Sequence, residues 1–288
     1  MKVLVYGARG WIGNQIVEYL NNQKITYIIG ICRINNEIEL QEEIRLINPT
    51  HIISCIARTQ GNNNTSTSEY LQDPNTLAEN IAGNLYTPLL LAIISEELSI
   101  HYTYLGTGCI FNYDLDHPIG DENTGFKEED HPNFVGSNYS IVKGYTDKMM
   151  RLFNNTLNLR LRTCINYQKN NRNFITKFIS YEKICSMPNS ITSLPDLIPA
   201  IIDMMSKNII GTVNLTNHGL ITHDEILNMY KEIVDPTFTW KNMTLEEQSE
   251  ILISEKANNF LDTTKLKQLC PYIKSVKEAV KDCLLNYK

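Results

Sequence analysis

The sequence predicts an α/β fold in which helices cover both faces of a parallel sheet and a smaller C-terminal lobe is attached. The first observation is that short β-branched or aromatic runs alternate with longer amphipathic runs up to residue 165. This alternation is typical of a doubly wound parallel sheet. The second is a turn with three closely spaced glycines between the first two runs. The third is a change after residue 165 to Asn-rich loops with scattered helices.

The first elements follow from their local pattern. KVLVY is short and β-branched and predicts a strand at 2–6, and the run at 10–23 carries apolar residues at helical spacing. ITYIIGIC predicts a strand at 25–32, and NEIELQEEIRLIN predicts a helix at 36–48. HIISCIA is almost continuously apolar, as expected of a buried parallel strand, at 51–57.

The alternation continues after a polar loop. LAENIAGNLYTPLLLAIISEE has a helical period and predicts a helix at 77–97, and HYTYLGT predicts a strand at 101–107. YSIVKGYTDKMMRLFN predicts a helix at 139–154, and LNLRLRTC predicts a strand at 157–164. Each strand is therefore followed by a helix that returns the chain to the same edge of the sheet.

The second part of the chain is less regular. Helical spacing predicts helices at 197–207 and 223–234, separated by polar loops. We expect a sheet domain at 1–165 and, at 166–288, a smaller lobe that binds the substrate and is interleaved with the sheet domain.

Composition excludes several classes of protein. A net charge of −6 and a pI near 5.6 argue against a nucleic-acid partner, which requires a basic surface. The seven cysteines are odd in number and form no C-x-x-C pair, which favours reduced thiols in the cytoplasm over disulfides or a metal site. The chain begins with a strand and no apolar run approaches the ~20 residues that span a bilayer, so we expect neither a signal peptide nor a membrane partner.

The glycine turn predicts a dinucleotide site. Gly7, Gly10 and Gly13 lie between the first strand and the first helix. Glycines there let the backbone approach a pyrophosphate, which binds at the helix N-terminus, so residues 1–165 are expected to form a Rossmann-type NAD(P)-binding domain. The alternative is that the glycines serve only a tight turn. The other residues expected to contact the cofactor here are Arg9, Trp11, Ile12 and Ala57.

One residue bears on the choice of cofactor. NAD-binding folds place an acidic residue about 20 positions beyond the glycines, where it binds the ribose 2′-hydroxyl. This chain has Arg33 at that place and no acid before Glu37. A guanidinium suits a 2′-phosphate, so the sequence predicts NADPH as the cofactor. The alternative is an exposed arginine on a loop.

A Tyr-x-x-x-Lys pair supplies candidate proton-transfer chemistry. Tyr139 and Lys143 are four residues apart on a predicted helix and share one face. A nearby ammonium is expected to lower the pKa of the tyrosine and fit it to protonate a carbonyl oxygen. The alternative is a solvated surface pair.

A hydroxyl and a thiol follow the strand at 101–107. Thr107 and Cys109 are two residues apart in LGTGCIFNYD, so on an extended chain they face the same side. The alternative for Cys109 is a small buried side chain within a core, the more common fate of a free cysteine.

These residues resemble those of the extended short-chain dehydrogenase/reductase superfamily. Thr107, Tyr139 and Lys143 match its hydroxyl, tyrosine and lysine, and Asn80 matches its helix asparagine. The blocks YGARGWIG, GTGCIFNYD, GFKEEDHPNFVGSNYS, NRNFITKF, PNSIT, TWKNMTLEEQ and NNFLDTTKL are similar to the bifunctional UDP-4-keto-6-deoxy-D-glucose 3,5-epimerase/4-reductase family, in the stand-alone form known from plants and a giant virus. One departure is SCIARTQGN at 54–62, where relatives carry a smaller, Gly-containing stretch.

The resemblance implies an activity and a role for the thiol. The substrate would be UDP-4-keto-6-deoxy-D-glucose. Cys109 and Lys177 would invert it at C3 and C5, and reduction at C4 would then give UDP-L-rhamnose. The reaction would take place in the cytoplasm, or in the host cytoplasm if the source is a virus. Thr107 and Tyr139 would bind O4, and Lys143 the cofactor ribose. The expected substrate contacts are Arg172, Asn173, Asn189, Lys256 and Asn259. A homodimer is expected through the helices at 77–97 and 139–154.

Two other functions stay open at this point. The chain is alternatively a monofunctional dTDP-4-dehydrorhamnose-type reductase in which Cys109 has no catalytic part. It is alternatively a non-catalytic NADP-binding regulator, although such proteins usually lose the Tyr139 and Lys143 pair that is intact here. The residues do not decide between UDP and dTDP as the nucleotide on the sugar.

Overall fold

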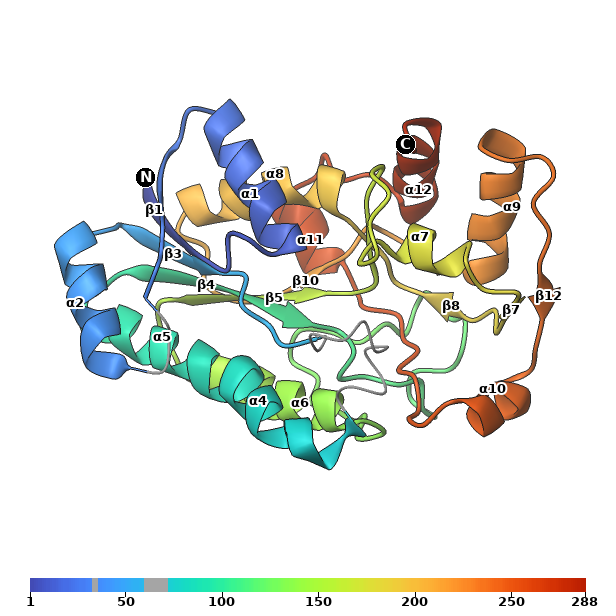
Figure 1. Cartoon of the computed structure of the whole chain (residues 1–288), viewed down its shortest axis with the longest axis horizontal. Coiled ribbons are helices and arrows are strands. Elements are labelled where there is room, and N and C mark those ends of the chain that lie inside the picture. The colour runs from blue at the N-terminus through green and yellow to red at the C-terminus, as the bar shows by residue number, and fades with distance from the viewer. Residues whose placement is uncertain (33–35, 60–71) are drawn as a thin grey trace.

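A parallel sheet of six strands forms the centre of the molecule (Figure 1). The computed structural model describes residues 1–32, 36–59 and 72–288. The sheet order is β10-β5-β4-β3-β1-β2, and the strands are β1 (Lys2–Tyr6), β2 (Thr26–Ile29), β3 (His51–Ser54), β4 (His101–Thr107), β5 (Thr156–Leu161) and β10 (Gly211–Leu215). The order reverses between β1 and β3, and sheets of this kind bind ligands outside the carboxyl ends of the strands at such a point. The predicted fold class is confirmed.

Helices cover both faces of the sheet (Figure 1). On one face lie α1 (Trp11–Asn22), α8 (Leu194–Ser206) and α11 (Thr264–Leu269), which bury Ile16, Leu197 and Leu266 in one core. On the other face lie α2 (Glu37–Ile47), α5 (Thr87–Glu97) and α6 (Asn138–Met150), which bury Leu40, Leu91 and Met150 in a second core. Because both faces are covered, most strand residues are apolar, as their near-continuous apolar runs predict, and the polar side chains that β5 and β10 bury, Asn158, Arg160 and Asn214, are hydrogen-bonded.

The region predicted as one helix at 77–97 is divided. It consists of α4 (Leu77–Ile81), a π-helical turn (Ala82–Tyr86) and α5, preceded by a 3₁₀ turn (Pro74–Thr76). The side chain of Asn84 is buried in the π turn, where its Oδ1 accepts from the Arg58 amide at 3.1 Å and its Nδ2 donates to the Arg58 carbonyl at 2.8 Å. By length and composition this region could cross a bilayer, but the most apolar part, α5, is packed on the sheet.

Three predicted strands are shorter than their apolar runs. The runs at 25–32 and 51–57 form strands only as far as Ile29 and Ser54. The run at 157–164 ends its main strand at Leu161, because Thr163 adopts a positive φ of 43° before the two-residue strand β6 (Cys164–Ile165) begins. The residues beyond each strand end therefore leave the sheet at its ligand-binding edge.

The second part of the chain contributes to both units. Its strand β10 and helices α8 and α11 complete the sheet domain. The remaining elements form the smaller lobe, with its own core around Ile175, Ile226 and Val280. They are α7 (Phe174–Phe178), β7 (Lys183–Ile184), β8 (Pro188–Asn189), β9 (Thr192–Ser193), β11 (Ile221–Thr222), α9 (His223–Ile233), β12 (Lys241–Asn242), α10 (Leu245–Ile251) and α12 (Val276–Leu285).

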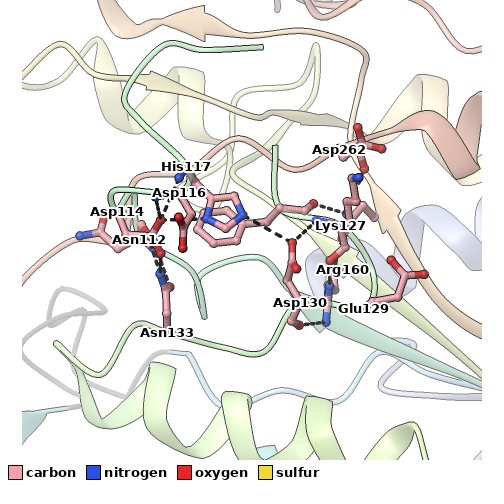
Figure 2. Close-up of polar contacts among 12 residues, drawn as sticks. Asn112, Asp114, Asp116, His117, Lys127, Glu129, Asp130, Asn133, Arg160 and Asp262 are labelled. Atoms are coloured by element: carbon pink, nitrogen blue, oxygen red, sulfur yellow. Dashed lines mark hydrogen bonds and ion pairs between the residues drawn. The ribbon is translucent and has the colours of Figure 1, made fainter. Parts of the chain in front are cut away.

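A long loop joins β4 to α6 and carries residues toward the ligand-binding edge. Figure 2 shows His117 of this loop between Asp114 and Asp130, with Nδ1 2.8 Å from Asp114 Oδ1 and Nε2 3.6 Å from Asp130 Oδ2. Asn133 donates to Asp114 at 2.7 Å, and the His117 ring stacks on Phe126. These contacts hold the loop in one shape, so the start of α6 has a fixed place beside β4.

A buried ion pair fastens α6 to β5. Arg160 is fully buried and donates to Asp147 of α6 from Nε at 2.9 Å and from Nη2 at 2.8 Å. A third donor, Nη1, reaches the carbonyl of Lys127 in the loop at 3.0 Å. A charge this deeply buried is tolerated because a bidentate carboxylate neutralises it.

Candidate active site

The glycine turn has the geometry of a dinucleotide cradle. Gly7 has φ +75°, and a Cβ added there would lie 2.8 Å from the backbone of Cys55. A Cβ on Gly13 would lie 2.2 Å from the Gly7 carbonyl oxygen, so α1 packs against the turn only with glycine there. Gly10 is the N-cap of α1 and no side chain caps this helix in the described part of the chain. Its first amides are therefore available to an anion, which fits a dinucleotide pyrophosphate.

The other predicted cofactor residues differ in their surroundings. Arg9 and Ala57 are exposed beside the turn, whereas Trp11 and Ile12 are partly buried against the core of the sheet domain. Arg33 lies outside the described residues. Asn80 is fully buried at the end of α4, where its Oδ1 accepts from Asn84 at 2.8 Å and its Nδ2 has no partner among the described residues.

The hydroxyl, tyrosine and lysine predicted from the sequence come together where β4 ends. Ser137 caps α6 by accepting from the Ser140 amide at 3.0 Å, which puts Tyr139 in the first helical turn beside Thr107. Lys143 lies one turn further and is almost completely buried. Its Nζ contacts the hydroxyl of Tyr104 on β4 and lies 3.4 Å from the Leu105 carbonyl.

The predicted acidic tyrosine is wrong for this structure. Burial raises the pKa of Tyr139, the nearby Cys109 raises it further, and a hydrogen bond with Thr107 only partly opposes these effects. Burial also lowers the pKa of Lys143 to about 7. The reason is that the desolvation of Lys143 by burial outweighs its attraction to Asp147 and Cys109, which acts in the opposite direction. Tyr139 is therefore protonated at neutral pH, as a proton donor must be.

Cys109 faces a cavity and is not part of a packed core. Its thiol is partly exposed, and its Sγ accepts a hydrogen bond from Nη1 of Arg162 at 3.4 Å. The amide of Cys109 donates to Thr107 Oγ1 at 3.1 Å, which holds the two side chains beside one another. Cys109 is therefore not a small buried side chain within a core, which was the alternative interpretation of this residue.

The cavity has a volume of about 710 Å³ and lies between the sheet domain and the lobe. Cys109 and Tyr139 line it from the sheet domain, and Lys177 of α7 lines it from the lobe. Lys256 and Asn189 also line it. The structure thus brings both predicted epimerisation residues to one space with the predicted proton donor.

Two of the lysines that line the cavity, Lys177 and Lys256, have lowered pKa values. Burial, followed by the charge of Arg172, lowers the pKa of Lys177. Burial also lowers the pKa of Lys256; Cys185 acts in the opposite direction and Lys177 adds a smaller lowering effect. An amine with a lowered pKa exchanges protons more readily near neutral pH, so Lys177 fits proton-transfer chemistry.

Three predicted substrate contacts do not line the cavity. Arg172 is exposed and donates to Thr59 Oγ1 at 2.8 Å. Asn173 is fully buried and caps α7, its Oδ1 accepting from the Ile175 amide at 3.1 Å. Asn259 is fully buried, and its Nδ2 donates to the carbonyls of Gly108 and Phe111 at 2.9 and 2.8 Å. Their side chains hold the fold together in place of the predicted contacts.

Sequence reasoning missed several residues of the site. Arg162 lines the cavity beside Cys109, and its signal was an arginine near the carboxyl end of a predicted strand, directly after the end of β5. His223 also lines it, and burial lowers its pKa to about 4, so the imidazole is neutral. Phe174, Phe178 and Tyr181 form an aromatic side of the cavity, which periodicity alone presents as ordinary core.

Comparison with known proteins places these features in a family. Residues 3–182 match the NAD dependent epimerase/dehydratase family. Protein L780 of Acanthamoeba polyphaga mimivirus is 43% identical over 289 residues, covering 100% of this chain and 99% of L780. The crystal structure of that protein, described as the L780 UDP-rhamnose synthase, has a TM-score of 0.95 at 42% identity and 99% coverage of both chains.

Two further relatives extend the comparison. The bifunctional dTDP-4-dehydrorhamnose 3,5-epimerase/dTDP-4-dehydrorhamnose reductase of Arabidopsis thaliana is 41% identical over 278 residues, covering 96% of this chain and 90% of the plant protein. The dTDP-4-dehydrorhamnose reductase of Bacillus anthracis, solved in complex with NADP, has a TM-score of 0.80 at 20% identity, covering 99% of this chain and 98% of that one. The similarity to the Bacillus anthracis reductase, at this low identity, shows a shared fold.

Proposed function

The chain belongs to the NAD-dependent epimerase/dehydratase family, and from this premise we propose that it converts UDP-4-keto-6-deoxy-D-glucose to UDP-L-rhamnose. It does so by inverting C3 and C5 and then reducing C4 with NADPH. The observation that carries the proposal is a single cavity lined by Cys109, Lys177 and Tyr139. Two chemistries on one sugar require two proton-exchanging groups and one proton donor within reach of the same ring.

Inversion is the first step of the proposed reaction. The ketone at C4 acidifies the hydrogens on C3 and C5, so each centre can lose a proton and regain one on the opposite face. Cys109 reaches the cavity from the end of β4, and Lys177 reaches it from α7 in the lobe. Groups on two different units can address the ring from different sides. Tyr139, which lines the cavity, donates a hydrogen bond to the oxyanion that forms at O4. Thr107 bonds to Tyr139 and does not itself line the cavity, and it is the second proposed donor to O4.

Reduction is the second step. Bound NADPH supplies the hydride that C4 accepts. Tyr139, kept protonated by burial, gives its proton to O4 as the alkoxide forms. Lys143 binds the cofactor ribose, and the turn of Gly7, Gly10 and Gly13 accommodates the pyrophosphate.

The rest of the cavity suits a nucleotide sugar. Lys256 carries an amino group on the lobe side of the cavity, and its ammonium form complements a diphosphate. The aromatic side formed by Phe174, Phe178 and Tyr181 offers flat surfaces for a nucleobase. The UDP form of the sugar is proposed from the mimivirus relative, whose description names UDP-rhamnose.

Substrate in heavy water tests the proposed function. Without NADPH, the enzyme should introduce deuterium at C3 and C5 of UDP-4-keto-6-deoxy-D-glucose, and addition of NADPH should then give UDP-L-rhamnose. NMR follows both stages. Reduction without any deuterium uptake would instead identify a monofunctional reductase. A parallel reaction with the dTDP-linked sugar measures which nucleotide is preferred.

Cofactor preference is a separate prediction. NAD(P) is the cofactor class of the family, and we infer NADPH because Arg33 stands where NAD-binding folds carry an acid. Arg33→Asp should weaken NADPH binding by about ten-fold or more, because a hydrogen bond to a charged group contributes ~1.5–3 kcal/mol, and should weaken NADH much less. Arg45→Asp, an exposed charge change on α2, is the matched control. Wild-type enzyme that binds NADH more tightly would contradict the assignment.

Assembly as a homodimer is a further prediction. Ile81, Tyr86, Ile141, Tyr145 and Met149 on α4, the π turn and α6 are all exposed apolar side chains. A surface of this kind, on helices that also hold the active site, favours pairing with a second copy. We therefore expect a dimer mass in light scattering at micromolar concentration.

A charge introduced on that surface should dissociate the dimer. Tyr145→Glu is expected to give a monomer, because a carboxylate buried at an apolar interface lacks a partner. Leu115→Glu, at a fully exposed position on the loop after β4, is the matched control and should remain dimeric. A wild-type monomer would rule the prediction out.

A further inference from the structure

Arg162 follows β5 at the point where β5 lies beside β4. Leu161 pairs with Thr107 in the register of the two strands, and the amide of Gly108 donates to the Leu161 carbonyl at 2.7 Å. Residues that follow neighbouring parallel strands emerge at the same edge of the sheet. Arg162 and Cys109 are therefore adjacent by topology, although 53 positions separate them.

The guanidinium of Arg162 is held by four acceptors, one from the adjacent Thr163 and three from other segments of the chain. Nη2 donates to Asn189 Oδ1 on β8 at 2.8 Å and to the carbonyl of Ala257. Nη1 donates to Thr163 Oγ1 at 2.9 Å and to Cys109 Sγ at 3.4 Å. The side chain is nearly enclosed, since Arg162 is only 8% exposed. Its Nε is buried and has no partner in the parts of the chain that the structure describes.

The partners of Arg162 include one group that can ionise. A carbonyl, an amide and a hydroxyl are neutral acceptors, whereas the thiol of Cys109 becomes an anion on losing its proton. Among the described residues, no carboxylate forms an ion pair with Arg162. An enclosed cation without a counter-charge is costly, so the environment favours an anion at Cys109.

Arg160 provides the comparison within the same strand. It is also enclosed, but Asp147 neutralises it through two hydrogen bonds of 2.9 and 2.8 Å. Two arginines, two positions apart, therefore face two kinds of partner. The carboxylate of Asp147 makes Arg160 a structural residue, and the thiol of Cys109 leaves the charge of Arg162 available to the cavity.

We propose that Arg162 and Cys109 form an ion pair in which the guanidinium holds the thiol as a thiolate, so that Cys109 enters the inversion of the sugar as the base. This assignment rests on the proposed function for the role of the thiolate, but the ion pair itself does not. Arg162 is thus a positioning residue that acts through Cys109. Burial is the main cause of the raised pKa of Tyr139, and a negative charge on the neighbouring Cys109 raises it further. In this proposal the thiolate of Cys109 is the base, and its charge helps to keep the acid, Tyr139, protonated.

Alkylation of Cys109 by iodoacetamide tests the ion pair without substrate or cofactor. Only the thiolate reacts, so the rate at pH 7 reports how much thiolate is present. Arg162→Met should lower the rate of labelling at Cys109 by about ten-fold or more at pH 7, as expected when an opposite charge within hydrogen-bonding distance is lost. Arg162→Lys keeps the charge and should retain most of the wild-type rate. At pH 10 the variants should converge, because the thiol then ionises without help.

The readout is restricted to one cysteine by peptide mapping, and Cys109→Ala identifies the labelled peptide. Lys256→Met removes a different cation from the same cavity and should leave the labelling of Cys109 unchanged. Labelling of Arg162→Met at the wild-type rate at pH 7 would overturn the proposal. A rate equally low at pH 7 and pH 10 would also overturn it, because altered access and not ionisation would then be the cause.

A second measurement does not require Arg162→Met to fold. Cys109→Asp supplies a permanent anion beside Arg162, whereas Cys109→Asn has the same shape without the charge. The ion pair predicts that the Asp variant melts at a higher temperature than the Asn variant, and the reverse order would overturn it. The proposed function fails separately: wild-type enzyme that introduces no deuterium at C3 or C5 would refute the inversion and leave the labelling result intact.

Discussion

Replacing Tyr139 with Phe should lower the rate of reduction at C4 by about 10²–10⁴-fold, the contribution usual for a positioned general acid. The ring and its packing in the first turn of α6 remain, so the loss is that of one hydroxyl. Burial raises the pKa of this hydroxyl and keeps its proton in place until an alkoxide forms at O4. The measurement is NADPH oxidation with substrate already inverted at C3 and C5.

The same variant should keep part of its hydrogen exchange. Thr107 remains to stabilise the oxyanion at O4, so deuterium should still enter at C3 and C5 without NADPH, at a reduced rate. Tyr145→Phe removes a hydroxyl from an exposed tyrosine of the same helix and is the matched control. Reduction by Tyr139→Phe at the wild-type rate would show that another group donates the proton.

The sequence predicts most of the fold because the sheet is parallel and covered. Most of its strand residues are apolar on both faces, and its helices carry an apolar stripe, so each leaves a distinct pattern in the sequence. The residues at the strand ends follow from the same logic, since parallel strands present their carboxyl ends at one edge. This is why the sequence places Thr107 and Cys109 at that edge, whereas Tyr139 lies on a helix and its link to them rests on the Tyr-x-x-x-Lys spacing and the family resemblance.

What the sequence leaves out is burial at individual polar positions. Asn173, Asn189 and Asn259 all lie in polar stretches of the C-terminal part, yet Asn189 alone of the three lines the cavity. The other two are taken up by a helix cap and by backbone carbonyls. Which amide meets a ligand depends on long-range contacts, such as that of Asn259 with Gly108, and no local pattern encodes them.

The ionisation of the Tyr139 and Lys143 pair shows the same limit. Helical spacing correctly puts them on one face, but spacing carries no information on depth. Lys143 is enclosed and meets Tyr104, a residue on a different element that the spacing does not reveal. Desolvation then lowers the pKa of the lysine to about 7 and raises that of the tyrosine. The pairwise argument from charge attraction predicted the opposite direction for Tyr139.

Replacing Cys109 with Ala should separate the two chemistries. The thiol is lost, while Thr107, Tyr139, Lys143 and the glycine turn keep their places, because the Cys109 amide and not its side chain bonds to Thr107. Deuterium uptake at C3 and C5 should fall by about 10²-fold or more, the effect of removing a general base. Reduction of substrate that is already inverted should continue, since it requires none of the atoms removed.

Cys164→Ala is the matched control for this prediction. Burial raises the pKa of Cys164, and the nearby Cys109 raises it further, but Cys164 does not line the cavity. Its removal should leave deuterium uptake unchanged, so a loss confined to Cys109→Ala would assign the exchange to one thiol. Uptake by Cys109→Ala at the wild-type rate at both carbons would mean that Lys177 and other groups carry out the inversion. Uptake lost at one carbon alone would show that the thiol serves that centre and that a different base serves the other.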